Sequence, residues 1–170
     1  MKIINIIDED LVNYKVCSMY VVFPNCSFKC DKECGKNVCQ NSPLISAPVL
    51  EIGTAEICER YKDNSLSHAL VLAGLEPFDS PYDLLSLIDC FRNKYEIKDD
   101  IIIYTGYTEE ELAEGNSSYS KVLKSLYENV LGYKNIIIKF GRYIPNDAPH
   151  FDEVLGVNLA SNNQYAKKVS

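Results

Sequence analysis

The sequence predicts an α/β fold with a mostly parallel sheet, and three observations lead to this prediction. Short apolar segments rich in β-branched residues recur along the chain, and the segments between them carry apolar residues at helical spacing. Glycine follows the later apolar segments closely. Strands that alternate with helices in this way form βαβ units, whose neighbouring strands run parallel. The length of 170 residues suits one core, so we expect a single domain over residues 1–170.

Four strands are expected, with three helices connecting them. The expected strands are residues 16–22, 69–73, 100–105 and 135–139. The expected helices are residues 49–62, 80–95 and 118–132. Residues 1–15 offer one extra strand, whereas the tail after Pro145 has no clear pattern.

Composition and charge argue against two classes of partner. No apolar run approaches the ~20 residues that a bilayer span requires, and the N-terminus turns acidic where a signal peptide would have its cleavage site. We therefore expect a cytoplasmic protein with no membrane partner. The formal net charge of -7 argues against a nucleic-acid partner, because affinity for nucleic acid depends largely on Lys and Arg neutralising phosphates.

Four of the seven cysteines lie in one loop, residues 23–44, which we expect to bind a cofactor. In a reducing compartment, clustered cysteines bind metal or carry out redox chemistry more often than they form disulfides. A structural zinc site, an iron–sulfur cluster and simple packing are the three alternatives. Packing suits Cys17, Cys58 and Cys90 better, because these three sit inside apolar patterns. The cysteines of the loop are Cys26, Cys30, Cys34 and Cys39.

Four loops are expected to meet at one edge of the sheet, because the carboxyl ends of parallel strands point the same way. Any one of them is also compatible with ordinary turn chemistry, since glycine commonly ends a strand. Together, and with one of them rich in thiols, they predict a shared pocket. The loops are residues 23–44, 74–77, 104–107 and 140–143.

Several short motifs occur in a recognisable order. They are C-x-F-x-C at 26–30, Cys39-Gln40-Asn41, Gly74-Leu75-Glu76-Pro77, Tyr104-Thr105-Gly106-Tyr107, Gly141-Arg142-Tyr143 and Ser161-Asn162-Asn163-Gln164. In order and spacing the chain resembles the radical S-adenosylmethionine (SAM) enzymes, and within them the anaerobic ribonucleotide reductase activating proteins. The resemblance extends over about residues 15–165.

The resemblance implies both a fold and an activity. The fold would be a shortened, open (β/α) partial barrel of mostly parallel strands. The activity would be reductive cleavage of SAM at a [4Fe–4S] cluster, giving methionine and a 5′-deoxyadenosyl radical. Three thiolates leave one iron of the cluster open to SAM. The partners implied are a large glycyl-radical enzyme, the anaerobic ribonucleotide reductase, and an electron donor such as flavodoxin or ferredoxin.

The resemblance also assigns residues to the cofactor and SAM. The backbone of Ala73, Gly74 and Leu75 would meet the methionine amino group, although Leu75 replaces a glycine of the family motif. Thr105 and Gly106 would lie on the other side of the ligand, and Glu76 would hold its loop rather than react. Phe28 and Val38 would lie beside the cofactor, with Val38 where the family often has an aromatic residue near adenine.

The third cluster ligand is open between two cysteines. Cys26 and Cys30 match the first two ligands of the family's C-x3-C-x2-C loop, but Glu33 stands where the third is expected. Cys34 is one residue late, whereas Cys39 follows an insertion and precedes Gln40-Asn41, as the family's third cysteine precedes a similar pair. We favour Cys39 and keep Cys34 as the alternative.

Two other functions share parts of this pattern. A radical SAM maturase of another protein or peptide would carry the same cluster loop. A zinc-stabilised binding module would use all four loop cysteines and have no SAM pocket.

Overall fold

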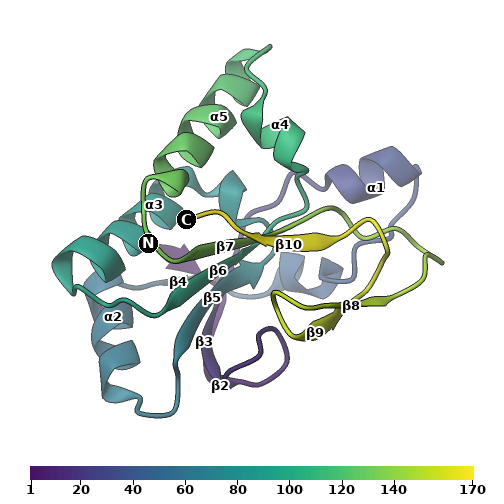
Figure 1. Ribbon diagram of the computed structural model, residues 1–170. Helices are drawn as coiled ribbons and strands as arrows, with labels where there is room; N and C mark the ends of the chain where they lie inside the picture. Colours follow the sequence, from purple (N-terminus) through teal and green to yellow (C-terminus); the bar gives the residue numbers. More distant parts are fainter.

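The protein is built on a six-stranded mixed sheet, as the computed structural model of residues 1–170 shows (Figure 1). The strand order is β10-β7-β6-β5-β3-β2. The four central strands pair in parallel, each with the next of the four along the chain. They are β3 (Ser18–Phe23), β5 (Ala69–Gly74), β6 (Asp100–Tyr104) and β7 (Ile136–Phe140). The four strands expected from the sequence are therefore present and parallel.

The edges of the sheet show that the expected open (β/α) partial barrel is wrong. β2 (Asn5–Asp10) pairs antiparallel with β3, and β10 (Tyr165–Lys168) pairs antiparallel with β7. Parallel neighbours need a crossover of a dozen or more residues, usually through a helix. The chain has no helix between β2 and β3 or between β7 and β10. The parallel set therefore stops at four strands, and antiparallel strands cap both of its edges.

Three helices cover one face of the sheet. They are α2 (Thr54–Asp63), α3 (Pro81–Asp89) and α5 (Ser118–Leu131), and a π-helical turn, η3 (Cys90–Lys94), continues α3. Alternate side chains of the central strands, such as Leu72, Ile103 and Ile138, are fully buried against these helices. The main hydrophobic core lies between these two layers.

The opposite face has a lighter cover, made by a hairpin and by residues 11–17. The hairpin pairs β8 (His150–Asp152) with β9 (Val157–Leu159), and Figure 1 shows it on the side of the sheet away from the helices. Val71 and Ile102 of the sheet are buried against Tyr14 and Leu155. This second core covers the middle of that face.

The remaining elements are short. β1 (Lys2–Ile3) pairs antiparallel with β4 (Leu50–Glu51). Two short α-helices and two 3-10 helices lie in loops, and no helix in the chain is both long enough and apolar enough to cross a membrane. The short helices are α1 (Lys29–Cys34), α4 (Glu109–Ala113), η1 (Ser42–Ser46) and η2 (Pro77–Asp79).

We expect the substitution Gly74→Ala to destabilise the fold by roughly 2 to 4 kcal/mol, since a strained backbone and a steric clash add up. Gly74 ends β5 with a φ of +95°, and an added Cβ would lie 2.6 Å from Val22 Cγ1 and 2.9 Å from the Phe23 nitrogen. The side chain would thus meet strand β3 before it met any ligand. Urea titration measures the loss. The control is Gly53→Ala, because Gly53 has an ordinary φ of -72° and an added Cβ would have its nearest neighbour, the Glu56 nitrogen, at 4.0 Å, an ordinary van der Waals distance. Equal stability of the two variants would contradict this account.

Candidate functional site

A cavity of about 340 Å³ lies at the carboxyl ends of the parallel strands. Residues from all four expected loops line it: the cysteine loop and the loops after β5, β6 and β7. Tyr20, Tyr104 and Leu159, from the side of the sheet that the β8–β9 hairpin covers, also form part of its wall. Thiols, backbone groups and buried charges thus share one cavity.

Nine of the twelve residues assigned to the site from the sequence line this cavity. They are Cys26, Cys30, Cys39, Ala73, Gly74, Leu75, Glu76, Thr105 and Gly106. The three that do not line it are Phe28, Val38 and Cys34. Phe28 and Val38 are half-buried, whereas Cys34 is exposed at the last residue of α1.

The cavity thiols are close neighbours in a partly buried setting. All seven cysteines are free thiols. Burial raises the pKa of the Cys26 thiol to about 12. Burial, with the neighbouring Cys39 as a second cause, raises the pKa of Cys30 to about 11. Bringing these thiols together therefore disfavours their ionisation in the absence of a positively charged group.

Two side chains hold Cys39 near Cys30. The Oδ1 atom of Asp31 accepts hydrogen bonds from the N–H groups of Val38 at 2.8 Å and Cys39 at 2.9 Å. Asn41 donates from Nδ2 to the carbonyl oxygen of Gly74 at 2.6 Å. The first contact returns the chain to the start of α1, and the second fastens it to the end of β5.

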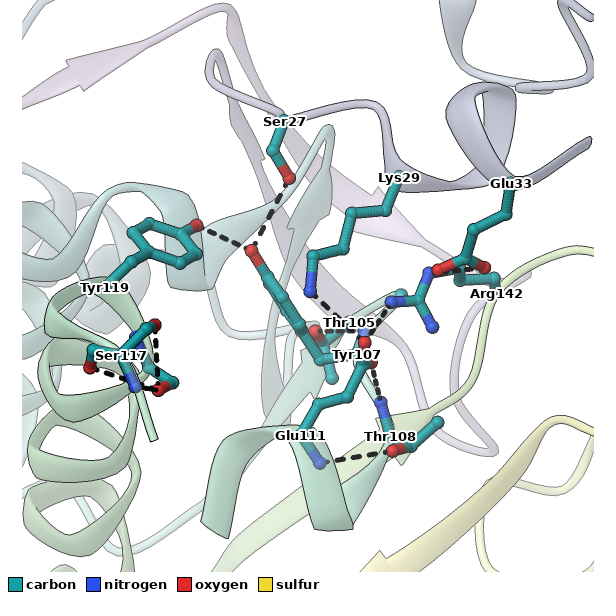
Figure 2. A network of polar contacts seen from close by, with 12 residues as sticks. Ser27, Lys29, Glu33, Thr105, Tyr107, Thr108, Glu111, Ser117, Tyr119 and Arg142 are labelled. Carbon is teal, nitrogen blue, oxygen red and sulfur yellow. Dashed lines mark hydrogen bonds and ion pairs between the residues drawn. The ribbon is translucent and has the colours of Figure 1, made fainter. Parts of the chain in front are cut away.

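A cluster of hydroxyl groups supports the start of the cysteine loop. Tyr107 and Tyr119 each donate a hydrogen bond to Asp79 Oδ1, at 2.6 Å and 2.7 Å, and the Ser27 N–H donates to Asp79 Oδ2. Figure 2 shows the hydroxyl of Tyr107 between those of Ser27 and Tyr119. Asp79 therefore links the buried Tyr107 to the backbone N–H of Ser27, the residue after Cys26, and fixes the start of the cysteine loop.

Charged side chains tie α1 to α4 and to the loop after β7 (Figure 2). Lys29 Nζ lies 3.1 Å from Glu111 Oε1 and 4.5 Å from the centre of the Tyr107 ring. Arg142, after β7, pairs with both Glu111 and Glu33 of α1. The Arg142 and Glu111 side chains are 12% and 28% exposed, so this pair is better shielded from water than a typical surface ion pair, whereas Glu33 is 58% exposed.

Glu76 is buried between the loops after β5 and β6. Its carboxylate accepts hydrogen bonds from the Phe78 N–H at 3.1 Å, the Thr105 hydroxyl at 2.9 Å and the Gly106 N–H at 2.8 Å. Burial raises its pKa to about 7, against the opposing effect of these donors. Glu76 thus joins two loops of the cavity wall through its side chain.

Sequence reasoning missed Lys139, which lines the cavity from β7. The side chain is buried, and Nζ donates a hydrogen bond to the carbonyl oxygen of Gly141 at 2.7 Å. Burial lowers its pKa to about 7, while the charge of Glu76 acts in the opposite direction. Its signal in the sequence is a lysine at an inward position of an otherwise apolar strand, where an unpaired cation is rare. Asp31 and Asn41 gave no such signal, because each is one polar residue among many in the loop.

A comparison with protein families places the cysteine loop in a known context. The family model of the 4Fe-4S single cluster domain matches residues 15–143. The chain belongs to this family. No curated protein and no solved structure gives a significant match. Of the alternatives for the cysteine loop of this 4Fe-4S domain protein, family membership therefore favours an iron–sulfur cluster over a structural zinc site.

The donor set of the 4Fe-4S domain suits such a cluster. In a [4Fe–4S] cluster each protein thiolate binds a different iron. The ligands therefore lie around the cluster and do not meet at one metal ion. The chain contains no three His, Cys, Asp or Glu side chains arranged to hold a single metal ion. Three neighbouring thiols in the wall of one cavity fit a cluster, and the chemistry of the donor set is the soft sulfur that iron–sulfur groups require.

We expect Glu76 to make the stability of the protein fall as the pH rises from about 4.5 to 7. Its pKa is raised from the ordinary 4.5 to about 7 in the folded state, so the folded protein holds the proton more tightly than the unfolded chain in this interval. The effect on the free energy of unfolding is on the order of 3 kcal/mol. Urea titrations of the wild type and Glu76→Gln across this range measure it as the difference in slope. Identical pH profiles would contradict the prediction.

Proposed function

We propose that the protein is a radical SAM enzyme that cleaves SAM reductively, with Cys26, Cys30 and Cys39 as the ligands of its [4Fe–4S] cluster. One observation carries the proposal: these three thiols line the same cavity as the ends of β5 and β6, while the fourth thiol of the loop lies outside it. A cluster with three protein thiolates supplies an open iron site and an electron to a ligand bound beside it.

The residues around the cavity offer contacts for the amino-acid end of SAM. The Leu75 N–H already donates to the Phe23 carbonyl at 3.1 Å, and the Gly74 carbonyl already accepts from Asn41. A carbonyl oxygen has two lone pairs, so Gly74 still has one to accept a hydrogen bond from an ammonium group. Lys139 provides a buried cation for a carboxylate.

The partners belong to the same proposal. The radical acceptor would be a glycine of a large glycyl-radical enzyme, such as an anaerobic ribonucleotide reductase, and a flavodoxin or ferredoxin would supply the electron. The same proposal includes a cytoplasmic location, because thiols stay reduced in that compartment. Maturation of another protein or peptide is the alternative, and incubation of the reduced enzyme with candidate acceptors separates the two by where a radical forms.

The proposal predicts that the wild type, reconstituted anaerobically with iron and sulfide and then reduced, converts SAM to 5′-deoxyadenosine. Chromatography measures this product. Cys39→Ala should abolish both the absorption of the cluster and the product, because one thiolate ligand is lost. Cys34→Ala is the matched control, since its side chain is exposed, and should retain both. A wild-type cluster that leaves SAM intact would overturn the proposed activity, and the reverse pattern in the two variants would make Cys34 the ligand.

We predict that Lys139→Met weakens SAM binding about tenfold or more, because a hydrogen bond to a charged group contributes roughly 1.5 to 3 kcal/mol. Anaerobic equilibrium dialysis of the cluster-loaded protein measures the affinity. The variant should be at least as stable as the wild type, since it removes a buried cation, so poor folding would not explain the loss. Lys121→Met on the exposed face of α5 is the control. Unchanged affinity in Lys139→Met would remove Lys139 from the ligand site.

A further inference from the structure

The insertion between Cys30 and Cys39 is closed on itself by one side chain. Its first residue is Asp31, and eight residues, 31–38, separate the two cysteines. The chain continues along α1 to Cys34, turns at Gly35 with a φ of +64°, and comes back to Cys39. Residues 32–37 of this insertion are exposed. The insertion is therefore a small excursion from the cavity wall, and its last residue, Val38, returns to contact its first residue, Asp31.

A single oxygen of Asp31 makes the closing contacts. Oδ1 accepts from the N–H groups of Val38 and Cys39, at 2.8 Å and 2.9 Å, and the thiol of Cys30 lies 3.8 Å from the same atom. Both Cys30 and Cys39 thus lie beside one acceptor. A carboxylate oxygen with two backbone donors is a charge-assisted contact, which is stronger than one between neutral groups.

This contact matters because the spacing of the cysteines along the chain does not select between the two candidate thiols, and Asn41, the other side chain that holds Cys39, contacts β5 and not the insertion. Three residues separate Cys30 from Cys34, and eight separate it from Cys39. The difference in closure entropy between loops of these lengths is smaller than the effect of two hydrogen bonds. Cys34 also lies four residues after Cys30 on α1, so the two side chains share a face of the helix. Cys34 is therefore a nearby competitor for the role of ligand.

We propose that Asp31 is the positioning residue that presents Cys39, and not Cys34, to the cluster. The inference rests on the proposed ligand set, and it adds the reason why an insertion is tolerated inside a cluster-binding motif. The carboxylate shortens the effective path between the two ligands, because it joins the ends of the excursion directly. Residues 32–37 are then not needed to position the cluster ligands.

The test compares Asp31→Ala with Asp31→Asn in full-length protein reconstituted anaerobically. Asn keeps an Oδ1 acceptor in the same place, whereas Ala removes it. We expect Asp31→Asn, whose amide oxygen is a weaker, uncharged acceptor, to bind iron and sulfide fully and to lose iron more slowly than Asp31→Ala. We expect Asp31→Ala to lose its iron to a chelator at least tenfold faster than the wild type, because two hydrogen bonds to a charged group contribute more than the roughly 1.4 kcal/mol that a tenfold change represents. Iron content, sulfide content and the rate of iron loss are the readouts.

The double variant Asp31→Ala/Cys34→Ala tests the choice between thiols. When the excursion is no longer closed, Cys34 becomes the nearer donor, so the cluster that remains in Asp31→Ala should disappear on removal of Cys34. Cys34→Ala alone should leave the cluster unchanged. A cluster in Asp31→Ala that is as stable as in the wild type and insensitive to Cys34→Ala would overturn the proposal. Equal loss of iron in Asp31→Asn and Asp31→Ala would overturn it as well.

The control is Asp147→Ala. The Asp147 carboxylate also accepts two backbone N–H groups, from Ala148 at 2.9 Å and Asn162 at 2.8 Å, and Asp147 does not line the cavity. Its loss should leave iron binding unchanged. These experiments measure iron retention and not SAM cleavage. A wild type that holds a cluster but leaves SAM intact would therefore contradict the proposed activity without contradicting the role of Asp31.

Discussion

The architecture of the cavity depends on one buried carboxylate. Glu76 accepts hydrogen bonds from the loop after β5 and from the loop after β6, and its own N–H donates to the Asn25 carbonyl at 2.7 Å at the start of the cysteine loop. Three of the four loops that line the cavity therefore meet at one residue. Loops on a sheet edge are usually the mobile part of a fold, and burying their shared acceptor makes them part of the core.

The sheet explains why these loops are adjacent. Four parallel strands deliver four carboxyl ends to one edge, and the helices all lie on one face. The other face receives only a hairpin and residues 11–17, so space remains over the strand ends. A closed barrel would fill this space with strands and inward side chains. Here antiparallel edge strands end the sheet, and the cavity lies at the carboxyl ends of its parallel strands.

Sequence reasoning found the parts of this protein that obey local rules. The strands from Ser18, Ala69, Asp100 and Ile136 are apolar and β-branched, so their existence and parallel pairing followed from periodicity. The barrel did not follow from it, because periodicity says nothing about which strand caps an edge; β10 lies in a tail whose pattern is too short to read.

The same limit applies to the site. Nine assigned residues lie in the cavity wall because motif order places them at strand ends. Asp31 acts through backbone groups that are adjacent only after the chain folds back, so no spacing in the sequence could mark it. Lys139 could have been read as an anomaly in its strand, since a cation at an inward position needs a reason. The residues that the sequence did not reveal are those whose hydrogen-bond partners become neighbours only in the folded protein.

The two buried charges in the cavity bear on what it binds. Glu76 and Lys139 do not form an ion pair, and burial disfavours the charged form of each, raising the pKa of the first and lowering that of the second. Both groups are hydrogen-bonded, Glu76 to three donors and Lys139 to the Gly141 carbonyl, but neither forms a salt bridge, so burial of the charged form still costs free energy. A ligand that carries an ammonium and a carboxylate on one carbon offers a counter-charge to both. The SAM proposed above as the ligand carries both groups at its amino-acid end, so its binding would give each buried group an opposite charge.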